Sequence, residues 1–460
     1  MISNPESPKG KAMTSISTQL SGFYKKLTYD DIPKEKITDI RWLVLDYLGV
    51  ASMGSSTQSG RVAIQHALSQ GSHPIATLIG SQRKAVPLLA AFANAISAHS
   101  IELDDVDDVA LYHFSPAIVS AALAMAEKTD ANGKAFLTAA YAGCEMMARL
   151  SNALNPSLRN RGFHTTPVCG VFGATVASGL LMGLTEEQMV NALGLAGAQA
   201  GGLMEMYGES SQKRFNPGPA ASNGTVSAEM AKGGYTGTDQ IFEGKRGVLK
   251  AFSDQSDPSQ LTRDLGKIFP VFIEFKPYAC ARPIHNAIDC VLEIQKKHSL
   301  SPKEIQKITV YRHPDWAHYH VIYDPKSINE GQVSLPYSVA VAFNTGQAFL
   351  DQYEDPQLHN AENKKLMDRV KVEPDAKLPR GVSCLMVVET GQGKTYRAQV
   401  DYPKGSKQNP MTDQEMIAKF TKLSRPVIAS GEVDRIVETA LSLERVKAMR
   451  ELTSHFQKGD

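Results

Sequence analysis

The sequence lacks an excess of charge of either sign. Its 49 Lys and Arg residues nearly balance its 48 Asp and Glu residues, which leaves a formal net charge of +1 over 460 residues. It also has no basic stretch interleaved with aromatic residues, the pattern that attracts a nucleic-acid backbone. These two absences argue against binding to nucleic acids and against a general attraction to anionic membranes.

Cysteine is scarce as well, with five residues and no Cys-x-x-Cys pair. An odd number of unpaired cysteines indicates a reducing compartment and argues against a disulfide framework or a structural zinc site. Residues 1–15 lack the apolar core of a secretory signal, and no arginine of the kind found in transit peptides precedes Arg41. No apolar run is long enough to cross a bilayer. We therefore expect a cytoplasmic protein.

The chain is too long for one small core, and the pattern of its apolar residues changes along its length, which indicates more than one domain. Helical spacing of apolar residues dominates residues 32–250, with a capping box at Thr185 and Gln188 that predicts a helix to about Gly201. A further helix is expected at 220–232. Around Phe269 the pattern changes, and residues 308–313, 383–390 and 395–402 read as strands, the last two as a hairpin.

Helical spacing returns after Pro403, at residues 413–423 and 431–440. We infer that the chain returns to its first domain. The expected fold is mainly α, with one large helical domain made of residues 1–269 and 405–460. Residues 270–404 form a smaller inserted α+β domain.

Residues 99–116 are the most informative stretch for chemistry. Two histidines bracket five carboxylates between Ala-rich helical segments that carry almost no charge: His99, Glu102, Asp104, Asp105, Asp107, Asp108 and His113. Burial and close carboxylates can bring a histidine or an acid near its working pKa, which proton-transfer chemistry requires. A solvated acidic loop that caps the next helix explains the same residues equally well.

Other polar groups stand out from apolar or loop surroundings. Lys213 and Arg214 follow a helix-breaking loop and precede a new helix, which suits a carboxylate site but also a solvated basic pair. His164 precedes two hydroxyl residues and an apolar helix, so it is a candidate proton donor or a helix cap. A Pro-broken stretch at the domain junction, where substrate clefts are common, carries Lys276, Arg282 and His285. Tyr337 begins a helix and either donates a hydrogen bond or packs.

The three histidines His313, His318 and His320 match no standard metal spacing, and we assign them to surface or packing roles. Taken in order, the other segments resemble the MmgE/PrpD family. The resemblance rests on residues 99–105, 113–115, 162–164, 213–224, 233–237, 276–285 and 334–337, and it extends from about Ser17 to Phe456. It implies a helical domain with a smaller α+β lid inserted before the last helices, no cofactor, no metal, and a homodimer.

The resemblance also implies an active site with an acidic residue, two histidines, a lysine and a tyrosine. The matching positions here are His113, His164, Lys213 and Tyr337, with Lys276 and His285 at the junction. Some positions depart from the family pattern: Glu102 stands for an Asp, Val106 for a Thr, and Arg214 for a Pro of the animal decarboxylase. These departures favour other reactions of the family over strict decarboxylation of cis-aconitate.

We therefore expect a cofactor-independent lyase for a small di- or tricarboxylate. The leading hypothesis is a hydro-lyase resembling 2-methylcitrate dehydratase. The alternatives are a carboxy-lyase resembling cis-aconitate decarboxylase, an isomerase resembling iminodisuccinate epimerase, and a carboxylate-binding protein without catalysis.

We expect His113 to act as general base, Asp104 to orient it, and His164 or Tyr337 to protonate the leaving hydroxyl. The substrate would be bound by Glu102, Lys213, Arg214, Lys276, Arg282 and His285, because preorganised cations stabilise the charge that develops next to a carboxylate.

Overall fold

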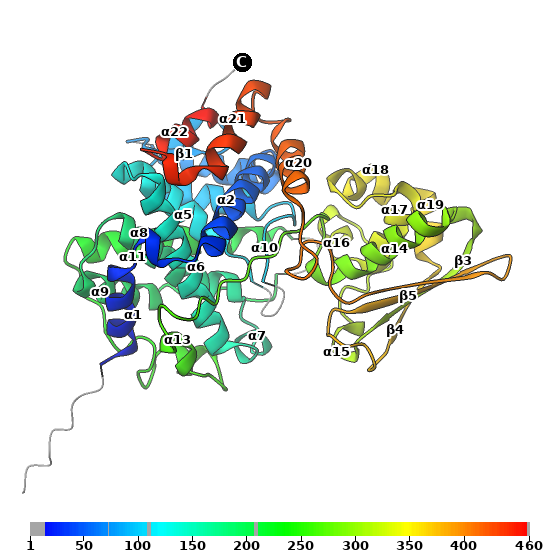
Figure 1. The fold of residues 1–460 in the computed structure, drawn as a ribbon, viewed down its shortest axis with the longest axis horizontal. Helices are drawn as coiled ribbons and strands as arrows, with labels where there is room; N and C mark the ends of the chain where they lie inside the picture. The colour runs from blue at the N-terminus through cyan, green and yellow to red at the C-terminus, as the bar shows by residue number, and fades with distance from the viewer. Residues whose placement is uncertain (1–13, 72, 108–111, 207–209, 458–460) are drawn as a thin grey trace, which may run out of the picture.

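The computed structural model describes residues 14–71, 73–107, 112–206 and 210–457. Residues 1–13, on which the expected lack of a signal sequence depends, lie outside these ranges, as does Asp108 of the acidic segment. Figure 1 shows two lobes side by side, a large helical body and a smaller lobe of helices and strands, which we call the lid. The expected mainly α fold with a smaller α+β domain is confirmed.

The body is built from amphipathic and fully buried helices. The long ones are α1 (Ile16–Lys26), α2 (Lys34–Ser55), α3 (Gln58–Ser69), α4 (Pro87–Ala98), α5 (Ser115–Thr129), α6 (Gly133–Leu154), α8 (Thr165–Leu181), α9 (Glu186–Gly197) and α11 (Pro217–Lys232). α8 packs against α5, α6 and α11. It crosses α6 so closely that a Cβ on Gly173 would lie 2.6 Å from the carbonyl oxygen of Gly143. Glycine at this crossing lets the two backbones approach.

Short elements complete the body. They are η1 (Tyr29–Asp31), β1 (Ala76–Leu78), β2 (Arg83–Ala85), α7 (Ser157–Asn160), α10 (Gln212–Phe215), α12 (Val248–Phe252) and α13 (Ser259–Thr262). The capping box at Thr185 and Gln188 is confirmed, but α9 ends at Gly197. α11 begins three residues before the expected start because Pro217 occupies its first turn, where a missing N–H costs nothing.

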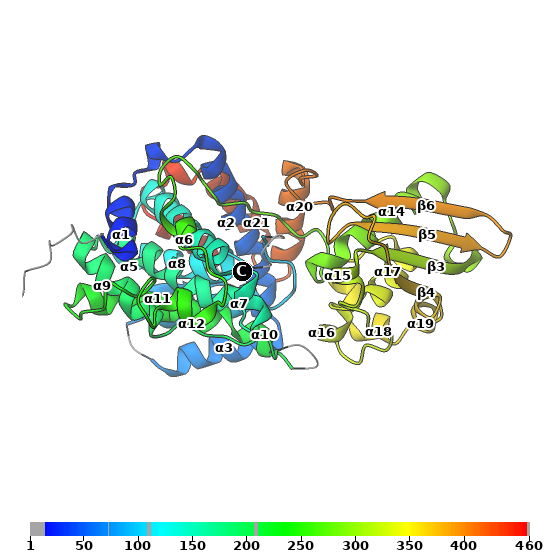
Figure 2. The same cartoon turned by 90° about the horizontal axis from the view of Figure 1, so that it is seen from below.

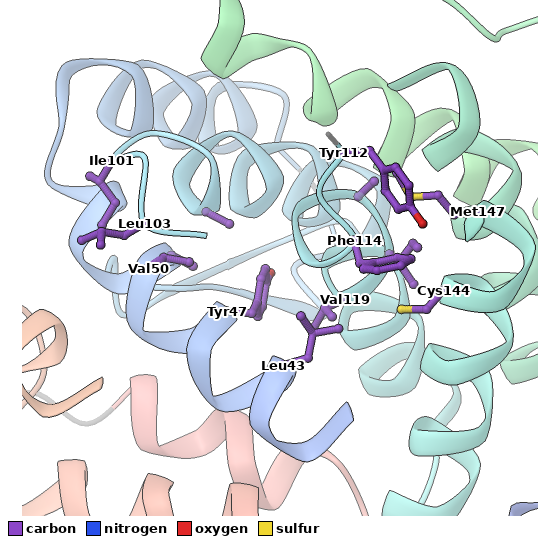
Figure 3. Packing of buried hydrophobic residues seen from close by; sticks show 14 of the residues in the cluster. Leu43, Tyr47, Val50, Ile101, Leu103, Tyr112, Phe114, Val119, Cys144 and Met147 are labelled. Carbon is purple, nitrogen blue, oxygen red and sulfur yellow. The ribbon is translucent and has the colours of Figure 1, made fainter. Parts of the chain in front are cut away.

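The acidic segment is anchored to the core by the apolar residues that alternate with its carboxylates. Ile101 and Leu103 belong to the same buried cluster as Leu43 and Val50 of α2, and Phe114 belongs to it at the other end of the segment. Figure 3 shows these side chains in the interior, where Phe114 faces α6. Between these anchors the backbone is not a regular strand, since Glu102 has φ +57°, and the carboxylates of Glu102 and Asp104 meet cations and histidines instead of the apolar cluster.

The lid contains a four-stranded sheet with the order β4-β3-β5-β6. The strands are β3 (Ile305–Arg312), β4 (Val370–Pro374), β5 (Cys384–Thr390) and β6 (Thr395–Val400), and β3 pairs in parallel with β4 and antiparallel with β5. β5 and β6 form the predicted hairpin. Figure 2 shows the four strands running along one side of the lobe.

Helical elements make up the rest of the lid. They are η2 (Arg282–Ile284), α14 (His285–His298), η3 (Pro302–Glu304), α15 (Pro314–Ala317), α16 (Ile328–Gly331), α17 (Leu335–Thr345), η4 (Leu350–Tyr353), α18 (Asp355–Leu358) and α19 (Ala361–Met367). α14 packs against β5 and β6, and α17 packs against α14 and β4.

The C-terminal helices lie on the body. They are α20 (Asp413–Ser424), α21 (Ser430–Leu441), η5 (Leu443–Arg445), α22 (Arg450–Thr453) and η6 (Ser454–Phe456), and both α20 and α21 pack against α2. The two chain connections between body and lid touch each other, because the N–H of Phe275 donates to the carbonyl of Gly405 at 3.0 Å. Glu274 also pairs through its backbone with Val106, so this junction adjoins the acidic segment. Among the described helices, none is both long and apolar enough for a membrane span.

Candidate active site

A pocket lies where the acidic segment, α7, α10 and the lid meet. Its lining residues are Glu102, Val106, His113, Arg159, His164, Lys213, Lys276, Ala281, Arg282, Pro283, Trp316 and His320. Six of these were predicted as site residues from the sequence: Glu102, His113, His164, Lys213, Lys276 and Arg282. The structure therefore brings together groups that are up to 180 residues apart in the chain.

Asp104 lies behind the pocket and holds two histidines. Its Oδ2 atom is 2.7 Å from Nδ1 of His99 and 3.1 Å from Nδ1 of His113. The carboxyl is fully buried, which works to raise its pKa, but His113, His99 and Lys276 hold that pKa well below its usual range. Asp104 is therefore an anion that can orient and stabilise a neighbouring imidazole.

The hydrogen bonds of His113 fix its tautomer. Nδ1 faces Oδ2 of Asp104 and also lies 2.5 Å from the carbonyl oxygen of Asp105, and both of these atoms are acceptors. Nδ1 must therefore carry a proton, since a carbonyl cannot donate one. Nε2 remains as the nitrogen of His113 that can exchange a proton with a bound molecule.

His164 has the opposite arrangement at the start of α8. The amide Nδ2 of Asn216 lies 3.0 Å from Nδ1 of His164 and 3.1 Å from Sδ of Met206. The thioether is an acceptor, so this atom is the NH₂ group, which makes Nδ1 of His164 an acceptor and Nε2 the protonated nitrogen. Burial, with the neighbouring His99 and His113, keeps the pKa of His164 well below its ordinary value, so the ring is neutral.

The carboxylate of Glu102 lies among three cations. It contacts the Lys213 ammonium and the Arg214 guanidinium, and the Lys276 ammonium lies 3.3 Å away. Burial works to raise the pKa of Glu102, but these three cations hold it well below the usual range. Its backbone has φ +57°, an uncommon conformation for a side chain other than glycine. The expected carboxylate site at Lys213 and Arg214 exists, and the chain's own Glu102 occupies it.

Burial lowers the pKa of Lys213 to about 8, although the neighbouring Glu102 carboxylate raises it. Arg214 does not line the pocket. Its guanidinium also donates to Gln332 Oε1 at 3.1 Å and lies 3.3 Å from Asn329 Oδ1, both in the lid. Arg214 thus connects body and lid behind Glu102, so its expected direct contact with substrate finds no support in the geometry.

Two expected residues do not reach the pocket. The Tyr337 hydroxyl donates to the carbonyl of Gln352 at 2.5 Å inside the lid. The His285 ring is buried, with Nε2 3.2 Å from the carbonyl of Cys280 and Nδ1 accepting from Arg282. Both side chains therefore have their hydrogen-bond partners within the lid.

Besides the small or apolar residues Val106, Ala281 and Pro283, the structure adds three lining residues that the sequence did not predict: Arg159, Trp316 and His320. His320 was assigned to surface or packing because its spacing fits no metal site. Its φ of +63° gave no signal in the sequence. The sequence does place a tryptophan close to several histidines. Without the fold, however, this pattern does not show that any of them faces a pocket.

One group of side chains offers metal-ligand atoms, within the part of the chain that the structure describes. The ligand atoms of His99, Asp104 and His113 lie within 4.8 Å of one another. Both histidines, however, direct Nδ1 at Asp104, and the Lys276 ammonium lies 3.8 Å from its other oxygen. A metal ion there would displace hydrogen-bonding protons and sit beside an ammonium group, so the residues fit a histidine–carboxylate pair better.

A protonatable histidine backed by a buried carboxylate, in a pocket of cations between a helical body and an α+β lid, defines an acid–base enzyme for small anions. The chain belongs to the MmgE/PrpD family. The model of the MmgE/PrpD N-terminal domain matches residues 18–261, and the model of the C-terminal domain matches residues 278–445.

Several curated proteins are similar over nearly their whole length. A cis-aconitate decarboxylase-like protein of Aspergillus oryzae is 30% identical, over 95% of this chain and 96% of its own. A cis-aconitate decarboxylase of Aspergillus terreus is 28% identical over 96% of both chains. That of Homo sapiens is 24% identical over 90% of this chain and 88% of its own. These relationships show an enzyme of the lyase class.

The leading expectation, a 2-methylcitrate dehydratase, finds no support among these relatives, and the decarboxylase alternative fits them better. Arg214 contacts Glu102 and the lid and does not itself line the pocket.

Proposed function

We propose that this enzyme is a cofactor-independent carboxy-lyase that decarboxylates cis-aconitate or a close analogue. The observation that carries the proposal is the pair of His113 and Asp104 beside the cations Lys213 and Lys276 in one pocket. The relatives that match the chain end to end supply the reaction class.

The reaction needs a proton and a place for negative charge. The bond to the departing carboxylate breaks, and its electron pair moves through the adjacent carbon–carbon double bond to the carbon beside another carboxylate. That carbon takes one proton, which gives carbon dioxide and 2-methylenesuccinate. Nothing is oxidised or reduced, and the conjugated carboxylate holds the developing charge.

Lys213 and Lys276 supply the electrostatic part. Both ammonium groups line the pocket and are almost entirely buried, where a charge acts through a low dielectric. Because Glu102 already holds them in place, they do not need to reorganise as the dienolate charge forms. Preorganised donors of this kind are the largest single contribution in many enzymes.

His113 supplies the proton. Asp104 holds its Nδ1–H and stabilises the imidazolium, so Nε2 can deliver a proton to carbon. Decarboxylation therefore uses His113 as general acid, the reverse of the base role expected for dehydration. His164, neutral with its proton on Nε2, donates a hydrogen bond to a substrate carboxylate.

The lid must move for substrate to enter. The open space between the lining side chains is about 40 Å³, which holds a few water molecules but not a six-carbon tricarboxylate. Trp316 and His320 come from the lid, whereas His113 and Lys213 come from the body. Opening and closing of this junction would admit the acid and then exclude water during the reaction.

The test is to incubate the protein with cis-aconitate, and in parallel with 2-methylcitrate, in D₂O that contains a chelator. Proton NMR should show 2-methylenesuccinate with one deuterium at the carbon that was protonated. His113→Asn should reduce the rate at least about a hundredfold, whereas the exposed control His66→Asn should not. Loss of water from 2-methylcitrate without decarboxylation of cis-aconitate would overturn the proposal.

We also propose a homodimer in a reducing, cytoplasmic compartment. The resemblance to the family carries the first part, and the five cysteines, all buried and free, support the second. Sedimentation equilibrium should give the mass of two chains at micromolar concentration. The mass of one chain across the concentration range would refute the dimer.

A further inference from the structure

The cations that line the pocket differ in whether an acidic side chain neutralises them. Lys213 and Lys276 contact Glu102, and Arg282 pairs with the buried Glu274 at 2.8 Å. Within the described part of the chain, Arg159 has no carboxylate partner. Lys213 and Lys276 share Glu102 with Arg214, whereas the charge of Arg159 is shared with no acidic side chain of the described residues.

Arg159 is placed by the short helix α7. The helix is tied to the loop after α12, because Ser157 Oγ accepts the N–H of Asp254 at 2.9 Å. The Arg159 side chain is half-buried, and its charge helps to lower the pKa of both His164 and His320 below their ordinary values, after burial in each case. Arg159, His164 of the body and His320 of the lid all line the same pocket.

The lid contributes a strained residue at this place. His320 has φ +63° while its carbonyl accepts the N–H of Leu335 at 2.8 Å, which holds the unusual backbone conformation. Strain of this kind in a residue other than glycine persists mainly at ligand sites. Burial lowers the pKa of His320 to about 3, so the ring is neutral and can donate a hydrogen bond to an anion without adding a buried charge.

We propose that Arg159 and His320 form a second carboxylate subsite, which binds a carboxylate that the reaction leaves in place. The substrate is then held at one end by the body's Lys213 and Lys276 and at the other end across the junction with the lid. The proposal rests on the proposed function for its substrate class, acids with at least two carboxylates.

This arrangement makes closure of the lid depend on substrate charge. An acid that fills both subsites neutralises Arg159 as the lid comes down. A monocarboxylate bound at Lys213 leaves Arg159 charged and partly desolvated, which disfavours the closed junction. The enzyme should therefore discriminate strongly between poly- and monocarboxylates.

Binding is measured with propane-1,2,3-tricarboxylate, which has no double bond and cannot react, by titration calorimetry. Arg159→Gln should weaken its binding about 10- to 150-fold, the range for a hydrogen-bonded charge. Binding of butyrate should change little. Arg161→Gln is the matched control, because Arg161 is exposed at the end of the same turn and pairs with Asp254. Equal weakening in both variants, or none in Arg159→Gln, overturns the subsite.

The contribution of the lid is tested by fluorescence, because the chain has two tryptophans and one of them, Trp316, lines the pocket. In a Trp42→Phe background, the tricarboxylate should shift the Trp316 emission. The shift should weaken in His320→Ala but persist in His318→Ala, whose parent side chain is exposed. An unchanged titration in His320→Ala removes the lid from the subsite.

These readouts separate the two proposals. Binding of the tricarboxylate that depends on Arg159, without turnover of cis-aconitate, would refute the proposed reaction and support the subsite. Turnover of cis-aconitate by Arg159→Gln with an unaltered KM would support the proposed reaction and refute the subsite. If the wild type binds none of the acids at millimolar concentration, the subsite is refuted whatever the activity.

Discussion

The two sides of the pocket differ in how their charges are balanced. On the acidic-loop side, formed by Glu102, Asp104, His113, Lys213 and Lys276, the ionised groups lie in pairs or larger networks. On the Arg159 side, formed by Arg159, Trp316 and His320, the cation has no acidic partner among the described residues. The charges of the acidic-loop side hold one another in place before an acid arrives, whereas the proposed subsite has a cation with no carboxylate beside it.

The acidic-loop side is also braced from behind. The Lys419 ammonium of α20 lies 2.6 Å from Asp46 Oδ1 and donates to the carbonyl of Leu103 at 2.6 Å. Leu103 stands between Glu102 and Asp104, so a helix that follows the lid in sequence fixes the segment that carries the chemistry. No such brace from the C-terminal helices reaches the described residues of the Arg159 side.

The largest effect should come from the acidic-loop side, with Asp104→Asn. The amide keeps the shape but removes the anion that faces His99 and His113, so His113 loses both its orientation and the stabilisation of its imidazolium. Turnover of cis-aconitate should fall on the order of a thousandfold. Steady-state kinetics give kcat, and circular dichroism shows whether the fold is kept.

The matched control is Asp254→Asn, an exposed aspartate that pairs with Arg161 and does not line the pocket, which should leave kcat unchanged. A shifted pH profile in Asp104→Asn would distinguish positioning from mere packing. A variant with wild-type kcat would show that the pairing on this side has no part in the reaction.

The next effect concerns stability. Glu102→Gln removes the carboxylate that Lys213 and Arg214 contact and leaves Lys276 with Asp104 alone, 3.8 Å away, which should lower the free energy of unfolding by about 3–5 kcal/mol. Because the cations depress the pKa of Glu102 in the folded state, its contribution is complete above the unfolded pKa of about 4.3 and is lost as the pH falls toward the lower native value.

Urea denaturation of Glu102→Gln at several pH values measures this. The variant should lose less stability than the wild type between about pH 5 and pH 3, since the titrating group is gone. The exposed control Glu187→Gln should match the wild type within about 0.5 kcal/mol. Parallel pH dependences for wild type and Glu102→Gln would contradict the paired network.

The sequence predicted the acidic-loop side better than the Arg159 side, and the reason is physical. His99, Asp104 and His113 lie within one stretch of 15 residues, so the sequence alone shows them as one cluster of polar groups. Arg159 and His320 are 161 positions apart, and only the packing of lid against body makes them neighbours. The same limit explains Arg214, whose contacts with Gln332 in the lid turn an expected substrate ligand into a link between lobes.

Similarly, the strands and helices of the lid followed from local patterns, but the directions of Tyr337 and His285 did not. Helical spacing places Tyr337 at the start of α17. Whether its hydroxyl meets the pocket or the carbonyl of Gln352 depends on how η4 packs beneath it. Side-chain direction at a helix end is decided by tertiary contacts that a one-dimensional pattern does not contain.

The smallest expected effect is the sharpest test of the comparison. Arg159→Gln and Arg282→Gln each remove one arginine from the pocket lining, but Arg282 leaves behind the buried carboxylate of Glu274 at 2.8 Å. Arg282→Gln should therefore cost several kcal/mol of stability, about 3–5, whereas Arg159→Gln should stay within about 0.5 kcal/mol of the wild type. Urea midpoints measured without ligand decide between these outcomes. If Arg159→Gln were as unstable as Arg282→Gln, Arg159 would be part of a structural ion pair. The two sides of the pocket would then not differ in how their charges are balanced.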